Sequence, residues 1–152
     1  MVYNKPQYTY KKGEYNMHKH IADKWSTALR SGEYEKCEGQ LKCSSIIIGG
    51  VFHCCLGVLC ELAIEDGVPI ETIMEEDGVP VEEEFGFFDG YDGVLPPSVI
   101  DWAGMDSDNA EGCYARTMEK GYTKIKSLAV DNDDGVSFYQ IADTIDKYWE
   151  VL

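Results

Sequence analysis

The chain places two adjacent thiols, Cys54 and Cys55, where an apolar β-branched run gives way to a helical pattern. A helix N-terminus is therefore expected beside them, and its partial positive charge would lower the thiol pKa and favour a nucleophilic thiolate. Asn132 and Asp133, expected in a downstream loop, would orient the base of a cysteine-dependent hydrolase. The sequence thus contains a candidate nucleophile and candidate orienting residues of a thiol enzyme.

The missing part of that enzyme is a well-placed base. The three histidines are His18 and His20 on the first expected helix and His53, which adjoins the thiols in sequence. Free cysteines in apolar segments usually act as small hydrophobic residues. The stronger interpretation is that Cys54 and Cys55 pack a helix on a sheet. No catalytic residue is therefore assigned, and an enzyme is the less favoured hypothesis.

Metal binding is not expected from the candidate ligands. The set Cys37, Cys43, His53 and Cys54 lacks the closely spaced cysteine pairs of a zinc site. Asp131 to Gly135 resembles a calcium loop in composition, but aligning its glycine leaves apolar residues at positions one and twelve. We expect turns here, with no metal and no cofactor.

The sequence patterns around these residues predict an α+β fold of about four helices on short antiparallel strands and hairpins. Periodicity, caps and turn residues give helices over 17–31, 54–66, 95–102 and from 138 to near the end, with Ser137 and Gln140 as a capping box. Strands are expected over 39–52, including a buried run at Ile46, Ile47 and Ile48, and a hairpin over 113–126.

An internal repeat separates the expected helices. The segment 65–71 (EDGVPIE) returns as 76–82 (EDGVPVE), and each copy is interpreted as a helix end, because glycine followed by proline stops a helix. Residues 81–93 are expected as an aromatic, acidic loop or hairpin. Residues 17–152 are thus one domain with an acidic insertion at about 68–93, preceded by an arm over 1–16.

Charge is distributed unevenly along the chain, whose formal net charge is −15. Residues 43–115 hold sixteen acids and no lysine or arginine. This excludes direct nucleic-acid binding and anionic membrane surfaces, which both require clustered cations. The tyrosines and lysines of the arm favour packing on a second subunit, hence a homo-oligomer, or on the acidic middle; the alternative is a frayed tail.

Four segments of the chain carry a resemblance to known proteins. In chain order they are ALRSGEY (28–34), CCLGVLCELA (54–63), LPPSVIDWAG (95–104) and SLAVDNDDGVSFYQIADTI (127–145). Together they resemble a family of small proteins of bacteriophage and prophage genomes. The resemblance implies a phage accessory protein in the bacterial host cytoplasm and supplies no reaction.

Three functions follow as expectations. The first is stoichiometric binding of a basic host protein, such as a DNA-binding or defence protein, by an acidic surface with aromatic anchors. That surface comprises Glu75, Glu76, Asp77, Glu82, Glu83, Glu84, Phe87, Phe88, Asp89, Tyr91 and Asp92. The second is capture of a small nucleotide-like defence signal, in a pocket or dimer interface, by Arg30, Tyr34, Lys36, Asn132 and Asp133. The third is the cysteine hydrolase.

Overall fold

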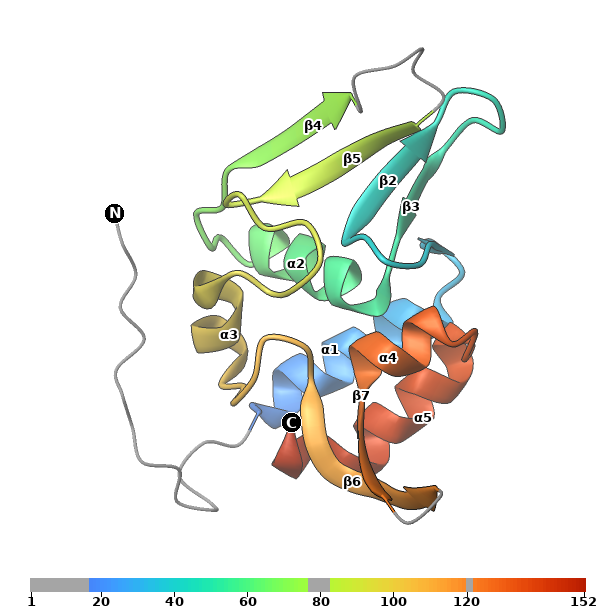
Figure 1. Ribbon diagram of the computed structural model, residues 1–152. Helices are drawn as coiled ribbons and strands as arrows, with labels where there is room; N and C mark the ends of the chain where they lie inside the picture. Colours follow the sequence, from blue (N-terminus) through green and yellow to red (C-terminus); the bar gives the residue numbers. More distant parts are fainter. Residues whose placement is uncertain (1–16, 77–82, 120–121) are drawn as a thin grey trace.

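The computed structural model describes residues 17–76, 83–119 and 122–152 (Figure 1). Within its strands, the side chains at 75, 76, 83 and 112–126 are not described. The expected arm over 1–16, the acids Asp77 and Glu82, and the turn at Lys120 and Gly121 therefore lie outside the described residues.

The α+β class is confirmed. The helices are α1 (Lys19–Arg30), α2 (Cys55–Glu65), α3 (Pro97–Ala103), α4 (Leu128–Asp133) and α5 (Phe138–Tyr148), followed by the 3-10 turn η1 (Trp149–Val151). The strands are β1 (Glu35–Lys36), β2 (Lys42–Ser45), β3 (Val51–His53), β4 (Thr72–Glu76), β5 (Glu83–Phe88), β6 (Glu111–Glu119) and β7 (Tyr122–Ser127).

The strands form a five-stranded sheet in the order β1-β3-β2-β5-β4 and a separate β6-β7 hairpin. Neighbours in the larger sheet are antiparallel, except that β1 runs parallel to β3. The stretch expected as an acidic insertion supplies β4 and β5, and β5 pairs with β2. This stretch is therefore part of the main sheet.

The core lies where α2 is enclosed between the sheet and the other helices (Figure 1). The α2 residues Leu56, Val58 and Leu59 are fully buried, as is Trp25 of α1, whose Nε1 donates to the carbonyl of Cys55 at 2.8 Å. The N-terminal and C-terminal halves meet where α1 packs along α5.

Most expected helix boundaries are confirmed. Ser137 and Gln140 form the capping box of α5, with both reciprocal hydrogen bonds present. Gly67 and Gly104 follow α2 and α3 in the left-handed conformation that favours glycine. In α1, His18 occupies the N-cap position, one residue inside the helix expected over 17–31.

Two expectations about 39–82 are wrong. The isoleucine run does not form a buried strand: Ile46, Ile47 and Ile48 make the turn between β2 and β3 and are 66%, 71% and 80% exposed. The second EDGVP copy does not end a helix, because it begins at the end of strand β4. A β-branched run predicts extended backbone, but the Gly49-Gly50 pair closes the hairpin immediately after it.

Helix α2 approaches the loop before β2 without an intervening side chain. A Cβ atom placed on Gly57 would overlap the carbonyl oxygen of Leu41 and lie 2.7 Å from its carbonyl carbon. That same carbonyl oxygen accepts a hydrogen bond from the backbone N–H of Cys54 at 3.3 Å. Gly57 therefore sets the distance between α2 and the sheet.

Candidate functional site

The two faces of the five-stranded sheet differ in their cover. Helix α2 lies against one face, and no other described helix or strand lies on the opposite one (Figure 1). Lys42 and His53 mark the covered face, since Lys42 Nζ and His53 Nε2 lie 3.1 Å and 3.3 Å from Oε1 of Glu61 in α2. Side chains alternate along a strand, so the sequence neighbours of Lys42 and His53 point to the opposite side.

Strand register extends this assignment across the sheet, because residues paired across strands share a face. Cys43 pairs with Phe52 and with Phe85, and Ile73 pairs with Phe87. We call these five residues the outer sheet face. Its three phenylalanines are half-buried and Ile73 is 43% exposed. The sheet therefore presents aromatic and aliphatic side chains where no described element covers them.

The acidic residues expected at a partner surface flank this face in the backbone register. Glu75 pairs with Phe85, Glu76 pairs with Glu84, and Glu83 pairs with Ser45. By this register Glu75 and Glu83 share the outer sheet face, whereas Glu76 and Glu84 share the face of Lys42 and Phe88.

The other predicted partner residues differ in their exposure and contacts. Phe88 is wrong as an anchor: it is fully buried on the covered face, with Lys42 Nζ 5.8 Å from its ring centre. Asp89 fixes the turn after β5, accepting from the N–H of Glu71 at 2.8 Å and from the hydroxyl of Ser98 at 3.2 Å. Phe87 lies on the outer sheet face as described above, and Tyr91 and Asp92 are exposed.

The covered face contains one charged cluster, made by Glu61 with His53 and Lys42. The hydrogen bond from His53, together with the charge and hydrogen bond of Lys42, holds the pKa of the Glu61 carboxyl below its usual range despite partial burial. A carboxyl whose folded pKa is depressed adds stability above its unfolded pKa and loses it as the pH falls through the folded value.

Replacing Glu61 with glutamine (Glu61→Gln) is therefore expected to lower the free energy of unfolding by about 1–2 kcal/mol at pH 7, as for a charged hydrogen bond. The difference from the wild type should shrink as the pH falls below about 4.3, the ordinary value for glutamate. Urea unfolding at pH 7, 5 and 3 measures it. A difference that stays constant over this range would contradict the assigned role of the carboxylate.

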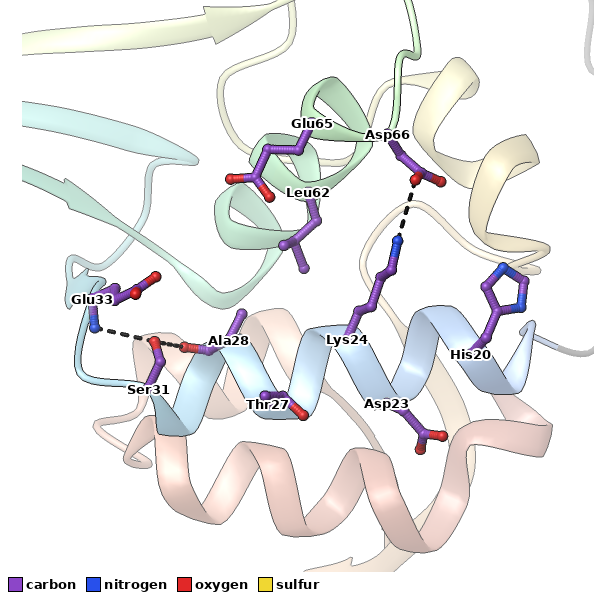
Figure 2. Close-up of a pocket in the computed structure, with 10 residues that line it drawn as sticks. All are labelled: His20, Asp23, Lys24, Thr27, Ala28, Ser31, Glu33, Leu62, Glu65 and Asp66. Carbon is purple, nitrogen blue, oxygen red and sulfur yellow. Dashed lines mark hydrogen bonds and ion pairs between the residues drawn. The ribbon is translucent and has the colours of Figure 1, made fainter.

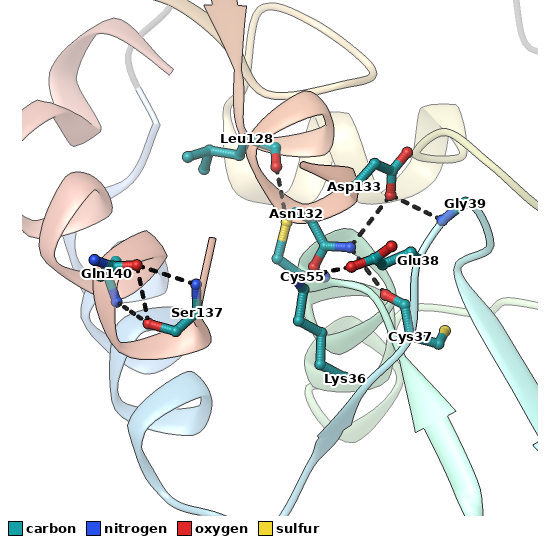
Figure 3. Close-up of polar contacts among 10 residues, drawn as sticks. All are labelled: Lys36, Cys37, Glu38, Gly39, Cys55, Leu128, Asn132, Asp133, Ser137 and Gln140. Carbon is teal, nitrogen blue, oxygen red and sulfur yellow. Dashed lines mark hydrogen bonds and ion pairs between the residues drawn. The ribbon is translucent and has the colours of Figure 1, made fainter. Parts of the chain in front are cut away.

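Asn132 and Asp133 join three segments rather than forming an open ligand loop (Figure 3). Both belong to α4, and Asn132 is completely buried. Its Oδ1 accepts from the N–H of Cys55 at 3.0 Å, and its Nδ2 donates to the carbonyl of Cys37 at 2.9 Å. Asp133 Oδ1 accepts from the N–H of Gly39 at 2.8 Å. The prediction of Asn132 as a ligand contact is wrong, because its polar atoms are used inside the protein.

The two thiols adjoin the helix N-terminus as expected, but burial dominates their chemistry. Cys54 is the N-cap of α2, and Cys55 is fully buried with its Sγ 3.5 Å from the carbonyl of Leu128. Burial raises the pKa of Cys54 to about 11 and that of Cys55 well above its ordinary value. The expected lowering of the thiol pKa is wrong, since loss of solvation outweighs the backbone hydrogen bonds at the start of α2 that lower it.

The remaining residues expected to bind a nucleotide-like ligand are engaged elsewhere. Arg30 forms ion pairs with Asp143 at 2.6 Å and Asp146 at 2.7 Å, linking α1 to α5. Lys36 Nζ lies 3.6 Å from Glu38, and Tyr34 packs edge-on against His53 with ring centres 5.3 Å apart. These side chains therefore make contacts with other residues of the protein.

A groove of about 760 Å³ lies between α1 and α2 (Figure 2). Its charged lining is mainly acidic. Lys24 crosses the groove to Asp66 at 3.2 Å, and Trp102 Nε1 donates to the same carboxylate at 2.8 Å. The carboxylates are Asp23, Glu33, Glu65 and Asp66. Because phosphate requires several cationic donors, this lining does not suit a nucleotide-like anion.

Neither a metal cluster nor a membrane-spanning helix occurs among the described residues. Within 17–76, 83–119 and 122–152, no group of three or more His, Cys, Asp or Glu is arranged to hold a metal ion. No helix within these ranges is long and apolar enough to cross a membrane.

Sequence reasoning missed the outer sheet face and the exposed isoleucine turn. The alternation Phe85-Gly86-Phe87-Phe88 carried a signal for the first, since residues two apart share a strand face. The pair Gly49-Gly50 directly after the isoleucines carried the signal for the second.

Comparison with known proteins gives one match. A family model described as "Domain of unknown function (DUF8296)" matches residues 17–149. No curated protein and no solved structure matches the chain.

Proposed function

The chain belongs to the DUF8296 family, whose description names no activity, and we propose that it acts by stoichiometric binding of a basic protein. The binding surface is the outer sheet face together with Glu75 and Glu83, the acids of β4 and β5 that share its register. The phage resemblance of the sequence extends the proposal to the partner, a DNA-binding or defence protein of a bacterial host.

One observation carries this proposal: an apolar sheet face without a described cover lies within the part of the chain that contains no lysine or arginine. Phe52, Phe85 and Phe87 belong to residues 43–115, which also hold sixteen acids. Binding energy at protein interfaces concentrates in buried aromatic anchors surrounded by a polar rim. The aromatic centre and acidic border match that arrangement.

The charge defines the chemistry of the partner. Carboxylates at this density attract a cationic surface from a distance and raise the association rate, with a strong dependence on salt. Proteins that bind duplex DNA present such surfaces, because they must neutralise its phosphates. The partner is therefore expected to have an apolar patch bordered by lysine and arginine.

The first test is native mass spectrometry of the tagged chain, isolated gently from bacterial cells. A complex with a single basic protein in fixed stoichiometry supports the proposal and identifies the partner. A mass excess of a few hundred daltons per chain would instead indicate a bound small molecule. That result, or a chain without any companion, would overturn the proposal.

A charge variant then tests the surface itself. We expect the double substitution Glu75→Gln and Glu83→Gln to slow association with the isolated partner by about threefold to tenfold at low salt, since steering depends on local charge. It should also flatten the dependence of the affinity on salt. Surface plasmon resonance at about 50 mM and about 300 mM salt measures both effects, because salt screens the charges more strongly at the higher concentration.

The matched control removes the same net charge elsewhere. Asp134 and Glu150 are exposed acids that lie outside the sheet, after α4 and in η1. The double variant Asp134→Asn and Glu150→Gln should leave the salt dependence nearly unchanged. Equal effects of the two double variants would show that total charge acts, and not the surface beside β5.

A further inference from the structure

The turn between β2 and β3 exposes three consecutive isoleucines. Ile46, Ile47 and Ile48 are 66%, 71% and 80% exposed, the three highest exposures among the described large apolar residues. Val51, at the start of β3, adds a fourth apolar side chain at 48%. We call Ile46, Ile47 and Ile48 the isoleucine tip.

The turn does not need isoleucine for its shape. Its backbone is closed by a hydrogen bond from the N–H of Gly49 to the carbonyl of Ser45 at 2.9 Å. The Ser45 hydroxyl accepts from the N–H of Ile48 at 3.2 Å, and Gly49 and Gly50 have φ angles of 75° and 96°. Turns of this kind usually carry polar residues, which lose no free energy by exposure. The serine and glycines build the turn, and the isoleucines are presented by it.

The isoleucine tip lies next to the acids of β5. At its base, Ser44 pairs with Glu84 and Ser45 pairs with Glu83, where β2 runs beside β5 (Figure 1). An exposed apolar cluster with an acidic border has the anatomy of an interface anchor. The tip therefore continues the surface proposed above to the end of the β2-β3 hairpin.

Charge distinguishes among the partners that an apolar tip could bind. Membrane surfaces are anionic, and residues 43–115 provide no lysine or arginine to hold them. A second copy brings another −15 of net charge and the same acids beside its own tip. A basic protein is the partner whose charge complements the border of the tip.

We infer that the isoleucine tip inserts into an apolar socket bordered by lysine and arginine on the basic partner, as the anchor that slows dissociation. This inference rests on the proposed function and names a second contact within it. Charged borders act mainly on association, whereas buried apolar anchors act mainly on dissociation. The two contacts therefore have separate kinetic signatures.

The prediction is that Ile47→Ser lowers affinity for the isolated partner by about tenfold to thirtyfold, as expected for an interface anchor. The loss should come from faster dissociation, with association and its salt dependence unchanged. The control is Tyr139→Ser on α5, which removes a side chain that is 62% exposed and far along the chain from the sheet. Both sites are exposed, so both variants should keep the wild-type melting temperature.

Photo-crosslinking in bacterial cells locates the contact and captures the partner in the same experiment. The full chain carries p-benzoylphenylalanine in place of Ile47, Phe87 or Tyr139, and crosslinked species are identified by mass spectrometry. The expected result is one basic protein crosslinked from positions 47 and 87 and not from 139.

Each other outcome has a definite meaning. Crosslinks from position 87 alone would overturn the tip as an anchor and keep the proposed function. Crosslinks from position 47 to a second copy, to residues 1–16 of the same chain, or to lipid would overturn the chosen occupant. No basic protein from either position would overturn both proposals.

Discussion

The substitution Gly57→Ala is expected to lower the melting temperature by about 6–12 °C. This corresponds to roughly 3 kcal/mol or more of lost stability, the upper range for overpacked cores, at about 2–4 °C per kcal/mol for a chain of this size. The added methyl group would overlap the backbone of Leu41, which cannot rotate away as a side chain can. The Leu41 carbonyl is also held by the N–H of Cys54.

A glycine with free space provides the control for this substitution. At Gly93 the nearest atom to an added Cβ is the carbonyl oxygen of Gly39 at 4.0 Å, so Gly93→Ala should stay within about 0.5 kcal/mol of the wild type, as surface substitutions do. Calorimetry or circular dichroism measures both variants. A melting temperature of Gly57→Ala equal to that of Gly93→Ala would contradict the close approach of α2 to the loop before β2.

The second large effect is expected at Asn132. Its replacement by alanine removes the acceptor for the N–H of Cys55 and the donor for the carbonyl of Cys37. Each buried polar group left without a partner costs about 1–3 kcal/mol, so with two such groups Asn132→Ala should lose roughly 2–6 kcal/mol. Urea unfolding measures the loss, and Asp134→Ala, two residues along at an exposed position, should change little.

The variant Asn132→Asp separates the two hydrogen bonds. An ionised aspartate keeps the acceptor for Cys55 but removes the donor and buries a charge beside Asp133. Burial raises the pKa of such a carboxyl, so the folded state binds the proton more tightly than the unfolded chain and gains stability as the pH falls. The deficit of Asn132→Asp relative to the wild type should therefore be smaller at pH 5 than at pH 7. A deficit independent of pH would show that this side chain is not buried as described.

The sequence predicted elements whose signals are local. Helices α1, α2, α3 and α5 each have an apolar stripe or a recognisable end, such as the Ser137 capping box or the glycine after α3. Helix α4 was missed because its six residues are too few to show helical periodicity. For the same reason Asn132 was assigned to a loop, although it is a buried link between α4, α2 and the loop before β2.

The candidate site was only partly predictable. The acids of β4 and β5 were recognisable from composition, but the faces of Phe87 and Phe88 depended on strand pairing that composition does not contain. The isoleucine run was the strongest local strand signal, yet it forms the turn between β2 and β3. The pKa of Cys54 depended on burial, which the helix N-terminus in the sequence did not reveal.

The packing of α1 along α5 has a consequence for how the chain folds during synthesis. Arg30 meets Asp143 across 113 positions of sequence, and Asn132 meets Cys37 across 95. The part of the α1 surface that packs on α5 is therefore covered only after α5 has been synthesised. Contacts this distant form slowly and late. Nascent chains that end before residue 138 lack α5 and leave this part of α1 uncovered, so chaperone binding is expected to persist until α5 has emerged.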